Sequence, residues 1–148
     1  MKMKLHTLIG ILAAIVLVAC DKDSFTSRPQ LKLKSVSTDF VPLNAPLQFT
    51  FEFTDKEGDL GDAVGIQKIS STCDDASFID TLKFTFPDIP RMKNTEGTLE
   101  VNLTNINLLP IRCFGGDTVE TAIFRFWIKD LAGNVSDTVE AGPITIMK

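Results

Sequence analysis

Two acidic, glycine-containing segments carry the side chains of this sequence that are best suited to chemistry. Oxygen-bearing side chains occur at alternate positions in the first segment and four residues apart in the second. They are Asp55, Glu57 and Asp59 in the first, and Asp130 and Asn134 in the second. Gly58 and Gly61 permit tight turns beside them. Because Ca²⁺ binds about six to eight hard oxygen ligands, this set is a candidate calcium site if the fold brings the two segments together.

Two other interpretations of the acidic set remain open. The spacing lacks the full ligand pattern of an EF-hand, and acidic loops are commonly solvated turns in which Asp55 and Asp130 would accept hydrogen bonds from backbone N–H groups. The third interpretation is a carboxylate-dependent hydrolase acting on envelope or dietary glycans, which would have to use this set as glycosidases use their paired acids.

The rest of the chain offers few parts for nucleophile-and-base catalysis. His6 is the only histidine, and it lies in a segment that we expect the mature protein to lose. Without an imidazole the mature chain cannot build a Ser-His-Asp or Cys-His arrangement, or a histidine-containing zinc site. The sequence therefore favours a protein that is not an enzyme.

The first twenty residues have the pattern of an export signal. Lys2 and Lys4 precede an uncharged apolar run over residues 8–19, which is shorter than the stretch of about 20 residues that spans a bilayer. The run ends in Leu17-Val18-Ala19-Cys20, which resembles the lipobox of bacterial lipoproteins. The resemblance implies cleavage of residues 1–19, acylation of Cys20 and stable anchoring to a membrane outside the cytoplasm. An ordinary signal peptide or a retained signal anchor are the alternatives.

Loss of the signal changes what the mature chain can bind. Two lysines leave with it, so the formal net charge of −4 becomes −6, and nucleic acid is not an expected partner.

Polar residues 20–29 are expected to form a flexible tether, and residues 30–148 one domain. Cys73 and Cys113 form an even pair in an oxidising compartment, which predicts a disulfide between them.

From residue 30 onward the hydrophobic period is two, which predicts strands rather than helices. The clearest case is 47–53, where Leu47 and three phenylalanines alternate with polar residues. Further predicted strands begin at 31 and cover 82–86, 99–103, 124–128, 144–146 and, more weakly, 65–70. About seven short strands in a domain of this length predict an all-β fold, a single immunoglobulin-like antiparallel β-sandwich.

Two loop segments carry a resemblance to known proteins. Residues 51–61, FEFTDKEGDLG, and 127–136, WIKDLAGNVS, resemble motifs of immunoglobulin-like lipoproteins of the Bacteroidetes, which often have no assigned activity. Members often have Asp in place of Lys56 or Glu57. Asp21 and Asp23 resemble the surface-export signals of some of these lipoproteins and favour the outer membrane. In other bacteria an Asp directly after the lipidated Cys indicates retention in the inner membrane.

An immunoglobulin-like topology would bring the two acidic segments to one end of the domain. Strands 49–53, 65–70 and 123–129 would be B, C and F, and the B–C and F–G loops emerge at the same end. On F, Trp127 has the parity of Arg125, opposite to the phenylalanines, which makes the two a candidate contact for a protein or a glycan. The alternative is that Trp127 packs under a loop or between the sheets. We therefore expect a lipid-anchored binding or structural module of the cell envelope.

Overall fold

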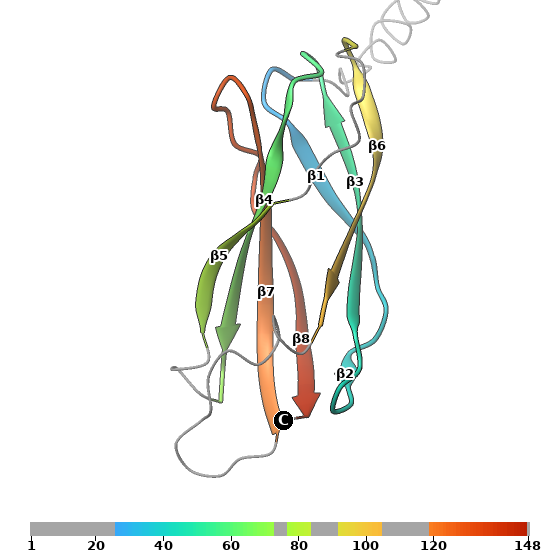
Figure 1. The fold of residues 1–148 in the computed structure, drawn as a ribbon, viewed down its shortest axis with the longest axis vertical. Helices are drawn as coiled ribbons and strands as arrows, with labels where there is room; N and C mark the ends of the chain where they lie inside the picture. The colour runs from blue at the N-terminus through green and yellow to red at the C-terminus, as the bar shows by residue number, and fades with distance from the viewer. Residues whose placement is uncertain (1–25, 73–76, 84–91, 105–118, 148) are drawn as a thin grey trace, which may run out of the picture.

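The computed structural model describes residues 26–72, 77–83, 92–104 and 119–147, which form two β-sheets packed face to face (Figure 1). The three-stranded sheet has the order β1-β3-β6, and the five-stranded sheet has the order β2-β8-β7-β4-β5. The strands are β1 (Gln30–Val36), β2 (Phe40–Val41), β3 (Leu47–Asp55), β4 (Leu60–Ser70), β5 (Phe78–Lys83), β6 (Thr95–Leu103), β7 (Val119–Asp130) and β8 (Val139–Met147). The predicted all-β class with two packed sheets is confirmed.

Alternating side chains of β3 and β7 build the centre of the core. Phe49 and Phe51 of β3 and Phe124 and Phe126 of β7 are fully buried. The ring centroids of Phe49 and Phe126 are 4.7 Å apart, and those of Phe51 and Phe126 are 4.9 Å apart. The planes are tilted by 55° and 59°, a geometry that contributes about 0.5–1.5 kcal/mol per pair beyond area burial. The alternating pattern therefore directs the phenylalanines of both strands inward, and the contacts between their rings hold the two sheets together.

The described strands differ from the expected ones in two places. β2 was not predicted, because two residues are too few to show a period, and it pairs with β8 in parallel rather than antiparallel. The N–H of Thr145 donates to the carbonyl of Asp39 at 2.8 Å beside this pairing. β4 begins at Leu60, earlier than the predicted 65–70. Its pairing with β7 is irregular between Leu60 and Val64, and glycines weaken the strand pattern of the sequence there.

An ion pair is buried in the sandwich, at positions where the alternation predicts apolar side chains. Lys68 of β4 is 1% exposed and Glu120 of β7 is 0% exposed, and the ammonium lies 2.8 Å from a carboxylate oxygen. Removing one partner of a buried ion pair is costly, because the charge that remains loses its contact with the opposite charge while it stays buried.

Several sequence predictions concern residues outside the described ranges. These are the signal segment, the lipidated Cys20, most of the tether, and the Cys73–Cys113 disulfide. Phe84 and Phe86 of the predicted strand 82–86 also lie outside them. Among the described residues, none belongs to a helix with the length and apolarity needed to cross a membrane.

One end of the sandwich gathers the β3–β4 turn, the loop between β7 and β8 and the start of β1 (Figure 1). Leu60 pairs with Asp130 in the β4–β7 ladder, and the N–H of Leu131 donates to the carbonyl of Asp59 at 2.8 Å. The two acidic segments are thereby fixed side by side. We call this end of the molecule the acidic end.

Candidate functional site

Four carboxylates from the two segments converge at the acidic end. Asp55 is the last residue of β3 and Asp130 is the last residue of β7, while Glu57 and Asp59 lie in the turn that follows β3. One carboxylate oxygen from each of the four lies within 4.8 Å of the others. Asp55 is 0% exposed and Asp130 is 3% exposed, whereas Glu57 is open to solvent. The fold thus brings together all four acidic residues of the predicted set, and we call them the acidic cluster.

A tightly packed turn fixes the cluster. Gly58 has φ +67°, and a Cβ at this position would overlap the backbone carbonyl of Met92. The N–H of Asn94 donates to the carbonyl of Lys56 at 2.9 Å, so residues 92–94 are joined to the turn. Glycine is required at position 58 for both its left-handed conformation and its space. The backbone that carries Glu57 and Asp59 is therefore fixed.

The capping interactions that the sequence allowed as an alternative are present. The N–H of Asp59 donates to Oδ2 of Asp55 at 2.8 Å, and the N–H of Asn134 donates to Oδ1 of Asp130 at 2.7 Å. The side-chain nitrogen of Asn134 donates to Oδ2 of Asp130 at 2.7 Å. Asn134, which the sequence grouped with the oxygen ligands, turns its nitrogen towards the cluster and orients Asp130.

These capping hydrogen bonds satisfy only some of the carboxylate oxygens in the cluster. Oδ1 of Asp55 and Oδ1 of Asp59 are buried and have no hydrogen-bond partner among the described residues. Burial raises the pKa of the Asp55 carboxyl above its ordinary value; the N–H of Asp59 opposes this shift, and the carboxylates of Asp59 and Asp130 add to it. Buried carboxylate oxygens without a partner are costly. The arrangement is suited to a bound cation, whereas the full burial of Asp55 keeps its carboxylate from a polysaccharide chain.

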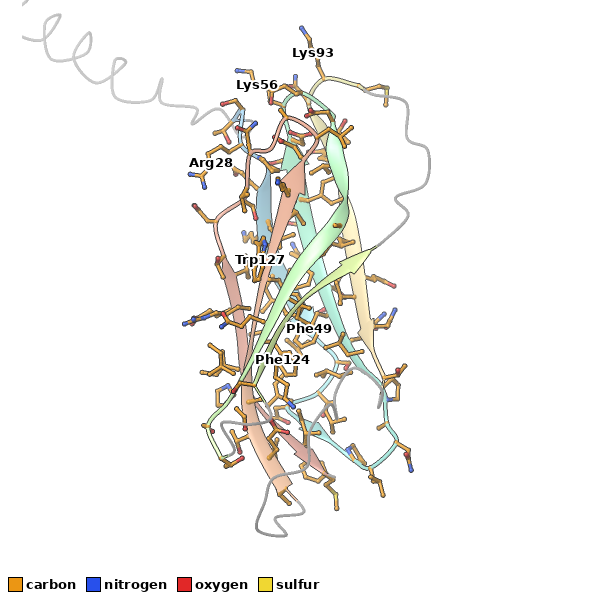
Figure 2. The ribbon with its side chains drawn as sticks, turned by 60° about the vertical axis from the view of Figure 1, so that its left-hand side comes forward. Arg28, Phe49, Lys56, Lys93, Phe124 and Trp127 are labelled. Atoms are coloured by element: carbon orange, nitrogen blue, oxygen red, sulfur yellow. The ribbon has the colours of Figure 1, made fainter. Side chains whose placement is uncertain are left out.

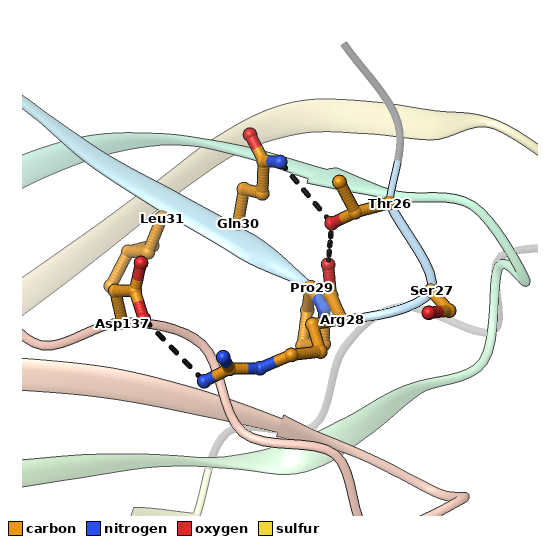
Figure 3. A pocket seen from close by; sticks show the side chains of 7 residues that line it. All are labelled: Thr26, Ser27, Arg28, Pro29, Gln30, Leu31 and Asp137. Atoms are coloured by element: carbon orange, nitrogen blue, oxygen red, sulfur yellow. Dashed lines mark hydrogen bonds and ion pairs between the residues drawn. The ribbon is translucent and has the colours of Figure 1, made fainter. Parts of the chain in front are cut away.

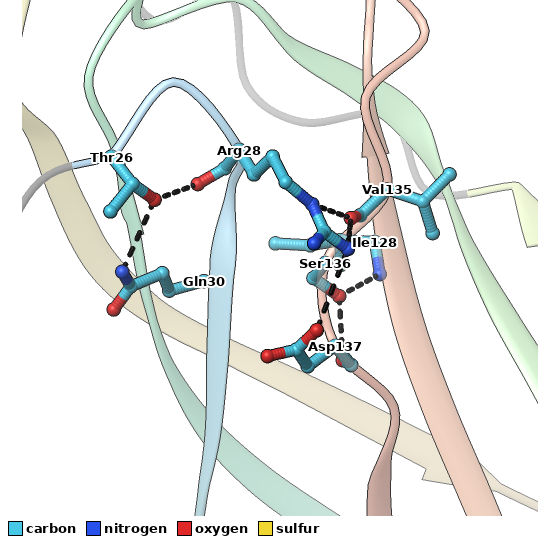
Figure 4. Close-up of polar contacts among 7 residues, drawn as sticks. All are labelled: Thr26, Arg28, Gln30, Ile128, Val135, Ser136 and Asp137. Atoms are coloured by element: carbon cyan, nitrogen blue, oxygen red, sulfur yellow. Dashed lines mark hydrogen bonds and ion pairs between the residues drawn. The ribbon is translucent and has the colours of Figure 1, made fainter.

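The entering chain docks beside the cluster. Nε and Nη2 of Arg28 donate to the carbonyl of Val135 at 3.0 and 2.8 Å, and Nη2 lies 3.4 Å from Oδ1 of Asp137 (Figure 4). The side chain of Asn134 also donates to the carbonyl of Ser27 at 3.3 Å. Arg28 and Asp137 border a cavity of about 410 Å³ at this point (Figure 3). Arg28, which the sequence places in the tether, is therefore attached to the β7–β8 loop.

A second candidate site lies on the outer face of the five-stranded sheet, at mid-height of the molecule and away from Arg28 and Lys56 (Figure 2). Trp127 of β7 lies directly across from Gly65 of β4, and the indole covers this glycine so closely that a Cβ there would overlap the ring. The predicted parity thus places Trp127 and Arg125 opposite the buried phenylalanines.

Polar side chains from three strands continue this face. Gln67 pairs with Arg125, and Arg125 pairs with Glu140 of β8; Nε of Arg125 donates to Oε1 of Glu140 at 2.6 Å. With Trp127 and Thr138 they line an open depression of about 330 Å³, near the lower end of the usual ligand-site range of about 300–1,000 Å³. We call this surface the tryptophan face.

Comparison with known proteins gives a structural similarity and no family. No protein-family model matches the chain, and no curated protein matches it. The structure is similar to part of a β-glucosidase from Listeria innocua, solved in complex with gluconolactone, with a TM-score of 0.45 and 14% sequence identity. The alignment covers 82% of this chain but only 16% of the glucosidase chain. A similarity of this size assigns neither a fold family nor an activity.

Proposed function

We propose that this chain is a lipid-anchored module of the cell envelope that binds a glycan, without catalysis, through the tryptophan face. The observation that carries the proposal is the indole of Trp127 lying over Gly65 on the outer side of the sheet. A flat aromatic ring packs well against the C–H face of a sugar ring. Because the ring is partly exposed and pressed against backbone, it would lose little conformational freedom on binding.

The polar row beside the indole supports a glycan rather than an apolar partner. Arg125, Glu140 and Gln67 offer both donors and acceptors for hydroxyl groups. The side chains of Arg125 and Glu140 are 40% and 54% exposed, so they can exchange water for sugar hydroxyls at small cost. Aromatic residues and arginine are also the usual anchors of protein interfaces, which makes a protein partner one of the outcomes to be tested.

Strand order supports an immunoglobulin-like assignment of the fold. If β1, β3 and β6 are lettered A, B and E, and β4, β7 and β8 are lettered C, F and G, the sheets contain A-B-E and C-F-G. β2 and β5 then extend the second sheet at its edges. The chain contains no tyrosine, so the tyrosine corner of many such domains is missing.

The lipobox resemblance at Cys20 supports the proposed location, an anchor in a membrane outside the cytoplasm and, by the acidic residues after it, in the outer membrane. Arg28 docks at the acidic end, whereas Trp127 lies at mid-height (Figure 2). An anchored molecule would therefore have its tryptophan face some distance along the domain from the lipid, where a polymer could reach it.

Affinity electrophoresis of the full chain in detergent, through gels that contain soluble β-glucan, xylan, mannan or peptidoglycan fragments, tests the proposal. We expect retardation by at least one polymer. We expect Trp127→Ala to weaken binding by about tenfold or more, since a tryptophan that becomes buried in an interface contributes about 2 kcal/mol to binding. Ile123→Ala is the matched control, because this residue is an exposed apolar side chain on the same face of β7.

The proposal fails if no polymer retards the chain, or if Ile123→Ala weakens binding as much as Trp127→Ala does. Capture of an envelope protein that depends on Trp127, with no polymer bound, would also overturn the glycan assignment and would indicate a protein-binding module instead.

A further inference from the structure

The acidic end holds a site that does not depend on glycan binding. We propose that Asp55, Glu57, Asp59 and Asp130 bind one Ca²⁺ ion, which links the β3–β4 turn to the end of β7. The four residues come from two segments that are far apart in sequence, and each contributes an oxygen to a single point of convergence.

Two unpartnered oxygens distinguish the cluster from an ordinary acidic surface. Asp55 is fully buried, and its Oδ1 has no hydrogen-bond partner. Oδ1 of Asp59 is likewise buried and without one. A buried carboxylate oxygen is normally hydrogen-bonded or bound to a metal, because leaving it unsatisfied is costly. A cation between the two aspartates removes this cost at both.

No positively charged side chain replaces such a cation within the described part of the chain. The ion pairs there join Arg28 to Asp137, Lys34 to Glu52, Lys68 to Glu120 and Arg125 to Glu140. None of the four cluster residues takes part in them. Neighbouring carboxylates without a counter-charge repel one another, and a divalent ion converts this repulsion into attraction.

The dimensions of the cluster favour Ca²⁺ over Mg²⁺. Oxygens bound to Ca²⁺ lie about 2.3–2.6 Å from it, so opposed ligands are separated by about 4.8 Å. The four cluster oxygens lie within 4.8 Å of one another and can therefore share one such ion. Mg²⁺ requires shorter distances of about 2.1 Å and near-ideal octahedral geometry, so its opposed ligands would have to lie closer together, at about 4.2 Å.

Asn134 extends the site towards the tether. Its side-chain nitrogen donates to Oδ2 of Asp130 and to the carbonyl of Ser27. Asn134 thus positions Asp130, one of the four proposed calcium ligands, and also holds the entering chain. Ca²⁺ bound to Asp130 would therefore also stabilise the point at which the domain joins its tether.

Calorimetric titration and thermal unfolding of the full chain, in detergent and after treatment with EDTA, test the proposal. We expect one Ca²⁺ per chain and an increase in melting temperature of about 5–10 °C when free Ca²⁺ is about 100-fold above the Kd. Asp55→Asn should abolish both responses. In EDTA this variant should melt no lower than the wild type, because it removes a buried charge and keeps an acceptor for the N–H of Asp59.

Two further variants complete the design. Asp130→Asn should also abolish the response, which keeps the test independent of any one substitution. Asp137→Asn is the matched control, because Asp137 is an aspartate of the neighbouring loop whose side chain is 97% exposed, and it should respond as the wild type does. Absence of bound Ca²⁺ at millimolar concentration, a response that survives Asp55→Asn, or an equal response to Mg²⁺ would each overturn the assignment.

Discussion

The packing of Trp127 on Gly65 makes a quantitative prediction for Gly65→Ala. Alanine normally improves a strand by about 0.5–1 kcal/mol relative to glycine. Here the added Cβ would lie less than 3.0 Å from three atoms of the indole, whereas carbon atoms in contact are about 3.5–4.0 Å apart. The ring must therefore move away from the sheet. Such overpacking costs about 1–3 kcal/mol, so the substitution should destabilise the protein despite its better strand propensity.

The effect of Gly65→Ala on stability should change from destabilising to stabilising once the indole is removed. In a Trp127→Ala background the three atoms nearest to the new methyl group are absent, and Gly65→Ala should stabilise the protein by about the propensity difference. In the wild-type background the overpacking cost less the propensity gain is a net loss of up to about 2.5 kcal/mol. At about 3 °C per kcal/mol, the melting temperature should fall by up to about 7 °C in the wild-type background and rise by about 1–3 °C in the Trp127→Ala background. A double-mutant cycle gives the coupling directly.

Fluorescence gives an independent readout, because Trp127 is the only tryptophan of the chain. In Gly65→Ala the emission maximum should move to longer wavelength as the ring leaves the backbone of β4. Equal effects of Gly65→Ala in the two backgrounds, with an unchanged emission maximum, would refute the described packing and with it the preformed tryptophan face.

Three further predictions concern the anchor, the disulfide and the buried ion pair. Cys20→Ser should release the chain from the membrane fraction, and mass spectrometry should find acyl chains only when Cys20 is present. Cys73→Ser or Cys113→Ser should destabilise the domain by about 4 kcal/mol, and reductant should lower the melting temperature of the wild type only. Lys68→Met should cost about 3–5 kcal/mol in denaturant unfolding because it removes the ammonium that contacts the buried carboxylate of Glu120, and Lys68→Met with Glu120→Leu should recover most of this loss.

Local sequence patterns predicted the larger part of the fold. Alternation of apolar and polar residues identified β3, the middle of β7 and the inward direction of their phenylalanines, because side chains on a strand point alternately to the two faces. The same rule predicted the outward parity of Trp127. It underestimated β4, where the buried Lys68 stands at a position of apolar parity and two glycines weaken the strand pattern. It also missed β2, whose two residues pair with a strand about a hundred positions away.

The sequence predicted which residues form the acidic cluster, but not their burial or their hydrogen bonds. Residue types and turn-forming glycines identified its four acids, and an assumed topology brought them together. The sequence could not tell that Asp55 is fully buried with an unpartnered oxygen while Glu57 remains in solvent. It also could not tell that Asn134 would present its nitrogen to Asp130, because side-chain burial and orientation depend on neighbours from distant segments.

The sequence by itself determined the strand period, the residues available for chemistry and the export pattern, since each of these depends on neighbouring residues alone. Only the tertiary structure decided which charges were buried, as with Lys68 and Glu120 at positions that read as apolar, and which glycine lies under Trp127. Those features arise where strands from distant parts of the chain meet, and the environment that each side chain meets there sets its energy and therefore its role.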